Sequence, residues 1–177
     1  MILMKNNKTN LEKQIKHRTK INPPGLDYFL NTVIPHYITR LKNIDMISVA
    51  DRVFSEFVRL SEADENWICR CVTCKEYKFR TEMQNGHYRT RSCRKYRYDT
   101  ANCHCQCPKC NVMLNGNYRN YHIYMVCSYG PEIEEQLRND NETVKLYDYD
   151  LIMQCVDRYH FIEKKQKDIE ERQNRTK

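Results

Sequence analysis

The chain has 177 residues, which suits one domain with extensions, and it is polar, with 30% charged residues and a formal net charge of +7 at pH 7. No stretch approaches the roughly 20 consecutive apolar residues of a membrane-spanning helix, and the amino terminus lacks the features of a signal peptide. We therefore expect a cytoplasmic protein without a membrane partner. In that compartment, Cys-x2-Cys pairs among the ten cysteines indicate metal binding rather than disulfides.

The positive charge is concentrated in the middle of the chain. Residues 67–120 carry a net charge of +8, against +2 for residues 1–66 and −3 for residues 121–177. A local basic patch favours a polyanionic partner, most often nucleic acid. A solvated basic face would have the same composition, so charge alone leaves both interpretations open.

The first 24 residues are polar and basic, and they lead into the sequence Asn-Pro-Pro-Gly at residues 22–25. Two prolines and a glycine stop a helix, so we expect residues 1–24 to form a disordered basic arm. A helical region is expected over residues 25–66. Its first helical pattern runs from Leu26 to Leu41, where Pro35 is expected to break or kink the helix.

A stronger amphipathic helix is predicted over residues 45–64. Its apolar side chains recur mostly at i, i+3, i+4 and i+7, which places them on one helical face. We expect Ser48 to be the N-cap, because Asp51 follows three residues later and resembles the acidic partner of a capping box.

Residues 67–130 are expected to form a zinc-bearing core. Over residues 67–106 the helical periodicity disappears, and short β-favouring runs among cysteines and basic residues indicate a hairpin or irregular strands. A short helix is then predicted to begin at Pro108. Another helix is predicted over residues 118–129, where a Gly-Pro pair ends it.

The carboxy-terminal region, residues 131–177, is expected to be helical. Proline and acidic residues favour a helix start at residue 131, and a long helix is predicted over residues 147–173. The apolar stripe of this long helix consists of Leu151, Ile152, Cys155, Val156, Tyr159 and Ile162. Beyond Glu163 the helix is charged nearly all round, so we expect that end to project or to fray.

Two Cys-x2-Cys pairs frame the basic segment: Cys71 with Cys74, and Cys107 with Cys110. Two such pairs are typical of a tetrahedral four-cysteine Zn²⁺ site, with Zn–S distances of about 2.3 Å. Four protein ligands leave no open coordination position. We therefore expect a structural zinc ion that compensates for a small apolar core.

Further cysteines crowd the same segments. Those that could hold a second zinc ion are Cys69, Cys93, Cys103 and Cys105. The choice between one ion and two stays open at this point. Cys127 and Cys155 fall on helical faces, and we expect both to be core residues.

The segment between the two cysteine pairs contains the motif GHYRT, with His87. The spacing N-x4-C-x2-C-N then places Asn102 before the second pair and Asn111 directly after it. Together with the basic and aromatic run at residues 94–102, this pattern resembles the phage lambda NinG/Rap family of recombination endonucleases. These are HNH enzymes of the His-Me finger superfamily. The resemblance runs from about Ser48 to Asp168.

The resemblance implies an α+β fold with a zinc-stabilised ββα-metal nuclease core, flanked by amino- and carboxy-terminal helices. It also implies cleavage of branched DNA, including Holliday-type junctions and D-loops. His87 would activate the attacking water, Asn102 would orient His87, and Asn111 would bind a catalytic Mg²⁺ or Mn²⁺. Imidazole suits a base near neutral pH, and a hard divalent cation stabilises charge at the phosphate.

One position departs from the common HNH pattern. Gly86 stands where many HNH enzymes have a metal-binding aspartate, although the NinG/Rap pattern also has glycine there. The second oxygen ligand is therefore left to Asn115, Asn117 or water, since Mg²⁺ usually keeps several waters.

The basic residues of the core are candidates for DNA contacts. Arg89 and Arg91 follow the histidine at alternating positions, so both could face phosphates. Arg94, Lys95 and Arg97 alternate with tyrosines in a run that could grip the DNA backbone or stack on unpaired bases near a branch. A solvated surface explains either set equally well.

We therefore expect a metal-dependent, structure-specific endodeoxyribonuclease whose partner is branched DNA. A homodimer through residues 26–62 or 147–173 is natural, because junction resolution needs two cuts. One alternative is a non-catalytic, zinc-stabilised nucleic-acid-binding module, which Gly86 slightly favours. Another is an interaction protein whose acidic carboxy-terminal part docks a protein partner, and this alternative predicts no affinity for branched DNA.

Overall fold

The computed structural model describes Lys13, residues 25–38 and residues 45–175. Apart from Lys13, the arm expected at residues 1–24 lies outside the described residues. The described chain combines helices with small sheets, which confirms the expected α+β class. Within it, no helix has both the length and the apolar character needed to cross a membrane.

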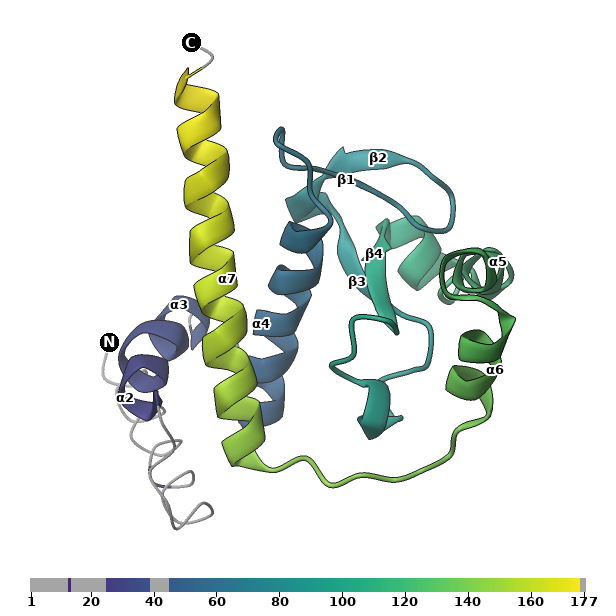
Figure 1. The fold of residues 1–177 in the computed structure, drawn as a ribbon, viewed down its shortest axis with the longest axis horizontal. Helices are drawn as coiled ribbons and strands as arrows, with labels where there is room; N and C mark the ends of the chain where they lie inside the picture. Colours follow the sequence, from purple (N-terminus) through teal and green to yellow (C-terminus); the bar gives the residue numbers. More distant parts are fainter. Residues whose placement is uncertain (1–12, 14–24, 39–44, 176–177) are drawn as a thin grey trace. The chain divides into compact units, whose positions relative to one another are not determined.

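The chain divides into two compact units, and each unit is assembled from separate stretches of sequence (Figure 1). The first, which we call the helical unit, consists of Met1–Phe57 and Leu146–Lys164. The second, which we call the cysteine-rich unit, consists of Val58–Lys145 and Lys165–Lys177. Helices α4 and α7 each run from one unit into the other.

The helical unit begins with a continuous helical run: α2 (Leu26–Tyr28), the π-helical segment η1 (Phe29–Val33) and α3 (Ile34–Ile38). The π-helical segment ends two residues before Pro35. Proline cannot donate a hydrogen bond to the preceding turn, and a wider turn accommodates it. Pro35 is therefore associated with a local change of helix type, and the helix is not broken at this residue.

Helix α4 (Met46–Ser61) starts after Asp45, so the expectation that Ser48 is the N-cap is wrong. The Ser48 amide donates to Asp45 Oδ1 at 2.9 Å, and the Ser48 hydroxyl donates to Asp45 Oδ2 at 2.8 Å. A carboxylate satisfies an unpaired amide at this end and also suits the positive end of the helix dipole. Asp51 lies inside the helix.

Helix α7 (Asp148–Arg175) carries the apolar stripe predicted for it, and all six stripe residues are buried. The other large buried apolar side chains of the helical unit include Leu26, Phe29, Leu30, Val33, Ile34, Tyr37, Val53 and Phe54. The charged end of α7 differs from the expectation that it projects or frays. Ile169 is buried there, and Gln173 Nε2 donates to the Glu65 carbonyl at 3.0 Å.

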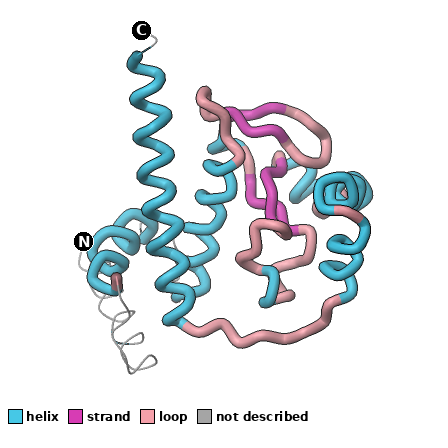
Figure 2. Tube along the Cα trace, in the orientation of Figure 1, coloured by secondary structure: helices cyan, strands magenta, loops and turns pink. Residues whose placement is uncertain are grey.

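Two small antiparallel hairpins form the strands of the cysteine-rich unit (Figure 2). Strand β1 (Ile68–Arg70) pairs with β2 (Tyr77–Phe79), and β3 (Gln84–His87) pairs with β4 (Cys103–Gln106). The predicted strands therefore form, although each has only three or four residues. The loop between β3 and β4 contains the short 3₁₀ helix η3 (Arg94–Tyr96).

Helices follow the second hairpin. Pro108 precedes the π-helical segment η4 (Lys109–Met113), and α5 (Tyr118–Tyr129) and α6 (Pro131–Asn139) come next, close to the predicted bounds. The unit has two small clusters of buried side chains. The sulfur-rich cluster contains Ala63, Cys69, Cys71, Met83, Cys105, Cys107 and Cys110, and the tyrosine-rich cluster contains Val72, Tyr88, Tyr96, Tyr121, Met125 and Leu137.

Candidate metal centre and active site

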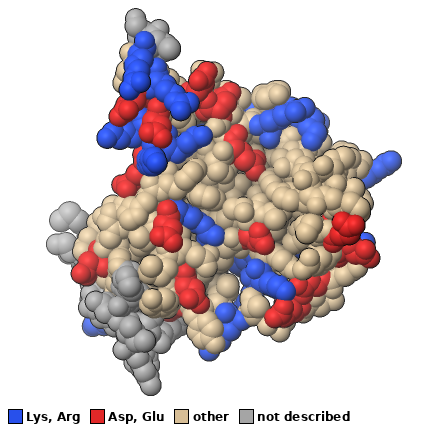
Figure 3. Space-filling model, in the orientation of Figure 1, with Lys and Arg blue, Asp and Glu red and all other residues tan. Residues whose placement is uncertain are grey.

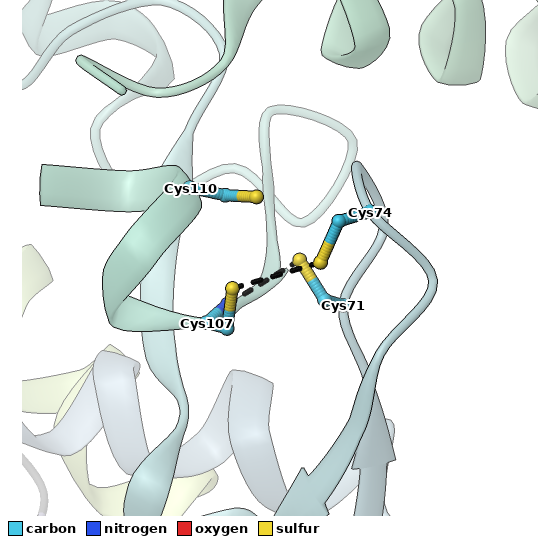
Figure 4. A group of neighbouring side chains, drawn as sticks. All are labelled: Cys71, Cys74, Cys107 and Cys110. Atoms are coloured by element: carbon cyan, nitrogen blue, oxygen red, sulfur yellow. Dashed lines mark hydrogen bonds between the residues drawn. The ribbon is translucent and has the colours of Figure 1, made fainter. Parts of the chain in front are cut away.

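The four cysteines of the two Cys-x2-Cys pairs converge on one point (Figure 4). Cys71 and Cys74 lie in the loop between β1 and β2, Cys107 follows β4, and Cys110 lies in η4. Their four sulfur atoms all lie within 4.8 Å of one another. The Cys74 and Cys107 sulfur atoms are 3.7 Å apart, close to the ~3.8 Å edge of a tetrahedron with Zn–S bonds of about 2.3 Å. The cysteines are thus positioned to bind a metal ion, and zinc fits them.

Hydrogen bonds to sulfur favour the thiolate form that metal ligands need. The Cys107 amide donates to Cys71 Sγ at 3.3 Å, and Asn117 Nδ2 donates to Cys110 Sγ at 3.4 Å. Burial raises the pKa of Cys71, but hydrogen bonds from the Cys74 backbone and from neighbouring groups outweigh burial and lower this pKa to about 6. Burial instead raises the pKa of Cys74 and that of Cys107, so in the absence of a metal ion only the Cys71 thiol, of these three, is shifted toward the thiolate form.

The remaining cysteines do not form a second cluster. Among the described residues, the four-cysteine group is the only set of three or more His, Cys, Asp or Glu side chains close enough to share an ion. Cys69 and Cys105 are buried in the sulfur-rich cluster instead. Cys155 is a core residue, as expected, but Cys127 is exposed on α5, so its predicted burial is wrong.

His87 lies at the end of β3 and is half-buried. Its Nε2 atom is 3.0 Å from the backbone carbonyl oxygen of Arg97, in the loop that connects β3 to β4. A carbonyl can only accept, so the ring donates from Nε2, and the acceptor nitrogen of the neutral ring is then Nδ1. A ring held in this tautomer can take a proton at Nδ1.

Asn102 is fully buried and ties together the two backbone segments next to this hydrogen bond. Its Oδ1 accepts from the Arg89 amide at 2.6 Å, and its Nδ2 donates to the Arg89 carbonyl at 3.0 Å and to the Tyr96 carbonyl at 2.9 Å. Arg89 follows His87 by two residues, and Tyr96 precedes the carbonyl that His87 contacts. These contacts of Asn102 therefore reach the His87 ring through the backbone.

A polar network that the sequence did not indicate holds the residue after His87. The Tyr88 hydroxyl donates to Glu134 Oε1 of α6 and lies 3.1 Å from His122 Nδ1 of α5. Burial raises the pKa of Glu134, but hydrogen bonds from Tyr88 and His122 outweigh burial and lower it below its ordinary value. No short-range motif links these residues, because they come from three separate elements.

Asn111 lies in η4 and contacts the first residue of β3. Its Nδ2 donates to Gln84 Oε1 at 2.8 Å, which leaves Oδ1 as the atom that could bind a metal. Side chains alternate along a strand, so Gln84 and Gly86 face one side of β3 and His87 faces the other. The hydrogen bonds of the described residues do not join Asn111 to His87.

The space beside Gly86 is filled by Gln106 of β4. A Cβ atom at position 86 would lie 2.1 Å from Gln106 Oε1. Gln106 is fully buried, and its Nε2 donates to the Gly116 carbonyl at 2.8 Å, so it cannot easily move. An aspartate at position 86 is therefore incompatible with this arrangement. Asn117, one of the expected substitutes, donates from Nδ2 to Cys110 Sγ, and its Oδ1 accepts from Asn120 Nδ2 at 3.0 Å.

Arg89 and Lys95, which were expected to contact DNA, bind residues at the end of α6 and just after it. The Arg89 guanidinium donates to backbone carbonyls of residues 137–140, at the end of α6. Helix ends leave such carbonyls unpaired, and a cation there complements the helix dipole. Lys95 Nζ lies 2.6 Å from both Asp140 Oδ2 and Glu142 Oε2. The acids that follow α6 thus neutralise part of the basic segment.

The other three basic residues lie in the loop between β3 and β4. Arg91 and Arg94 are exposed, and Arg97 donates to the Arg91 carbonyl at 2.9 Å. On the face of the molecule drawn in Figure 3, basic and acidic side chains are interspersed. A single continuous basic patch is not visible on that face, and DNA contact by this loop stays a prediction.

Comparison with known proteins identifies one family. The family model described as "Bacteriophage Lambda NinG protein" matches residues 38–172, which is well over half of the chain. Neither the curated proteins nor the solved structures contain a match. The matched segment includes all four cysteines of the metal cluster, His87, Asn102 and Asn111.

Proposed function

The chain belongs to the NinG family, which supports a role related to phage recombination, and from this premise we propose that it is a metal-dependent endonuclease that cuts branched DNA. In this proposal a hairpin held by the metal cluster presents His87 to a phosphate at a branch. The cut would hydrolyse one phosphodiester bond: water attacks phosphorus, and the leaving sugar oxygen departs from the opposite side.

The hydrogen bond of His87 carries this proposal. Donation from Nε2 to the Arg97 carbonyl fixes the orientation and the tautomer of the ring, and an oriented neutral imidazole is what a general base requires. The buried Asn102 supports both sides of this contact, so the ring is oriented before substrate arrives. A base positioned in this way typically contributes 10²–10⁴-fold to rate. Asn102 is a positioning residue in this scheme, because it acts through the backbone.

A catalytic cation would be held by Asn111 Oδ1 together with water, because Gly86 offers no side chain. Bound Mg²⁺ or Mn²⁺ would stabilise negative charge on the phosphate and on the leaving oxygen. In-line displacement puts the attacking water and the leaving oxygen on opposite sides of phosphorus. The proposal therefore requires the His87 ring and the cation at Asn111 to reach opposite sides of the same phosphorus atom.

The test is cleavage of a labelled four-way junction beside a linear duplex in Mg²⁺. We expect junction-selective cutting by the wild-type protein and a loss of roughly 10²–10⁴-fold in His87→Ala. His160→Ala is the matched control, because His160 is exposed on α7 and should leave the rate unchanged. Equal cutting by wild type and His87→Ala would refute the assignment of the base.

A second candidate is a zinc-stabilised module that binds branched DNA without cutting it. The filled space beside Gly86 and the absence of a carboxylate cluster at this hairpin, within the described residues, favour it. It predicts that wild-type protein binds the junction but never cuts it in Mg²⁺ or Mn²⁺. His87→Ala should then change neither activity nor the metal content.

We also propose that the active form is a homodimer, because resolution of a junction needs two cuts. Gel filtration with and without junction DNA tests this proposal. A monomer mass in both conditions would contradict it.

A further inference from the structure

The end of η4 and the residue after it expose three consecutive apolar side chains, which we call the apolar tip: Val112, Met113 and Leu114. Their exposed fractions are 61%, 76% and 49%. Apolar side chains adjacent in sequence and all exposed are unusual in a protein that buries much of the rest, and such surfaces commonly mark binding sites. The tip directly follows Asn111, the residue proposed to hold the catalytic cation.

The backbone around the tip is held in one conformation. Three successive residues have left-handed φ values: Asn115 (48°), Gly116 (86°) and Asn117 (47°). Residues other than glycine adopt this region at a cost. The turn is kept by the Gly116 amide, which donates to the Asn111 carbonyl at 3.1 Å, and by the Asn117 amide, which donates to the Leu114 carbonyl at 2.8 Å.

The turn is also anchored to the rest of the cysteine-rich unit. The buried Gln106 of β4 donates to the Gly116 carbonyl, and Asn117 donates to the sulfur atom of Cys110. The tip therefore projects from a support that includes a strand and a metal ligand. A rigid apolar projection loses little conformational entropy on binding.

The charge around the tip indicates which partner it fits. Residues 100–131 contain no Asp or Glu, and the tip lies between Lys109 and Arg119, both of which are exposed. Tyr118, which is half exposed, stacks on Tyr88 with ring centroids 5.0 Å apart. An apolar projection that is flanked in the sequence by exposed cations, in a stretch without acidic residues, suits a polyanion that has exposed apolar faces. Bases beside a phosphate backbone fit this description.

We propose that the apolar tip is a wedge that inserts between base pairs at the branch point of DNA. Proteins that kink DNA use Met, Leu and similar side chains in this way. Strands change partners at a branch, so base pairs there are held by fewer continuous strands, and we expect insertion there to cost less than insertion into a linear duplex. The tip thereby selects branched over linear DNA. This inference rests on the proposed function and assigns its substrate selectivity to three residues.

The test uses the full-length protein with zinc bound, in Ca²⁺ in place of Mg²⁺, with 2-aminopurine at the branch point of a four-way junction. Wild-type protein should raise the 2-aminopurine fluorescence as the base unstacks. The triple variant Val112→Ser, Met113→Ser, Leu114→Ser should lose this increase and bind the junction about tenfold more weakly. Its affinity for the linear duplex should change less than about twofold. Ile133→Ser, which alters an exposed apolar residue on α6, should behave like wild type.

Several outcomes would overturn the wedge. The first is unchanged fluorescence and junction affinity in the triple variant. A second is a wild-type protein that sediments as a dimer and a triple variant that sediments as a monomer, because the tip would then be a subunit interface. Met113→Ala is a milder variant in case the triple variant folds poorly, and its zinc content and circular dichroism show whether it is folded. If Met113→Ala unstacks the branch-point base as well as wild type does, that result would also count against the wedge.

Failure of the wedge and failure of the nuclease are distinguishable. A protein that unstacks the branch through the tip but never cuts DNA keeps the wedge and refutes the nuclease. A protein that cuts junctions with unchanged preference after loss of the tip keeps the nuclease and refutes the wedge.

Discussion

The helical unit and the cysteine-rich unit are stabilised in different ways. The helical unit buries a continuous set of large apolar side chains, such as Phe29, Phe54 and Leu151, from three helical segments. The cysteine-rich unit has strands of only three or four residues and two small clusters of sulfur and tyrosine side chains. Its backbone is held by buried polar side chains, including Asn102, Gln106 and Glu134.

The difference shows which contacts fix the positions of the candidate catalytic side chains. Apolar packing is non-directional and tolerates some repacking, which suits a unit without the candidate catalytic groups. Metal ligation and buried hydrogen bonds are directional, and each is costly to leave incomplete. The candidate catalytic histidine lies in the unit that uses directional contacts. We therefore expect the two units to respond differently to metal removal, to cavities and to acid.

Metal removal should have the largest effect and should act on the cysteine-rich unit. Structural zinc contributes about 10–16 kcal/mol in apparent terms to small zinc domains, more than the whole stability of many domains. We expect Cys107→Ser, or treatment with EDTA, to abolish the near-ultraviolet circular dichroism of the buried tyrosines in this unit. Cys127→Ser is the control, because Cys127 is exposed and outside the cluster. If the metal-free protein kept the near-ultraviolet circular dichroism of its tyrosines, the cysteine-rich unit would not depend on metal for its fold, and the contrast between the two units would be wrong.

A cavity in the helical unit should come next. Phe29 is completely buried, and Phe→Ala in a core typically costs about 3–5 kcal/mol. We expect Phe29→Ala to lower the free energy of unfolding by that amount in urea denaturation while zinc content stays unchanged. Phe161→Ala, at a 37% exposed position, should have less than half of that effect. Zinc loss in Phe29→Ala would mean that the two units are not independent in their stabilisation.

Loss of the buried amide of Asn102 should have a smaller effect on stability and a large one on activity. Asn102→Ala leaves backbone groups at Arg89 and Tyr96 without partners, which we expect to cost about 2 kcal/mol. Urea denaturation measures this cost, and the cleavage rate reports the loosened His87. Asn120→Ala is the control, since Asn120 is exposed and its side chain bonds only locally to Asn117. A stable but inactive Asn102→Ala would still support its positioning role, and full activity would exclude it.

Acid should have the smallest effect, through Glu134. Its pKa is lower in the folded protein than its ordinary value of 4.5, so its ionised form stabilises the fold above that pH. The stabilisation is lost as pH falls through the lower, folded value. Glu134→Gln should therefore flatten the fall of the urea midpoint as the pH drops below about 5, relative to wild type. If the urea midpoints of wild type and Glu134→Gln fell in parallel with pH, the hydrogen-bond network around Tyr88 would not depend on the charge of Glu134.

The sequence by itself determined the local features. The apolar stripe of α7, the starts of the helices after Pro108 and Gly130 and the two Cys-x2-Cys pairs were all readable, because each depends on periodicity or spacing over a few residues. The sequence led to wrong predictions where two neighbouring residues or two helical faces have the same local properties. Asp45 and Ser48 are both good N-caps, and helical periodicity did not distinguish the exposed face at Cys127 from a buried one.

Only the tertiary structure decided which polar groups meet. Arg89 looked like a phosphate ligand but caps α6, with a hydrogen bond to Leu137 across 48 residues of chain. Lys95 is neutralised by Asp140 across 45 residues. Asn102 reaches His87 through two backbone segments. Hydrogen bonds and ion pairs leave no periodic trace in sequence, because their partners are chosen by how distant segments pack, and the orientation of the candidate catalytic histidine depends on that choice.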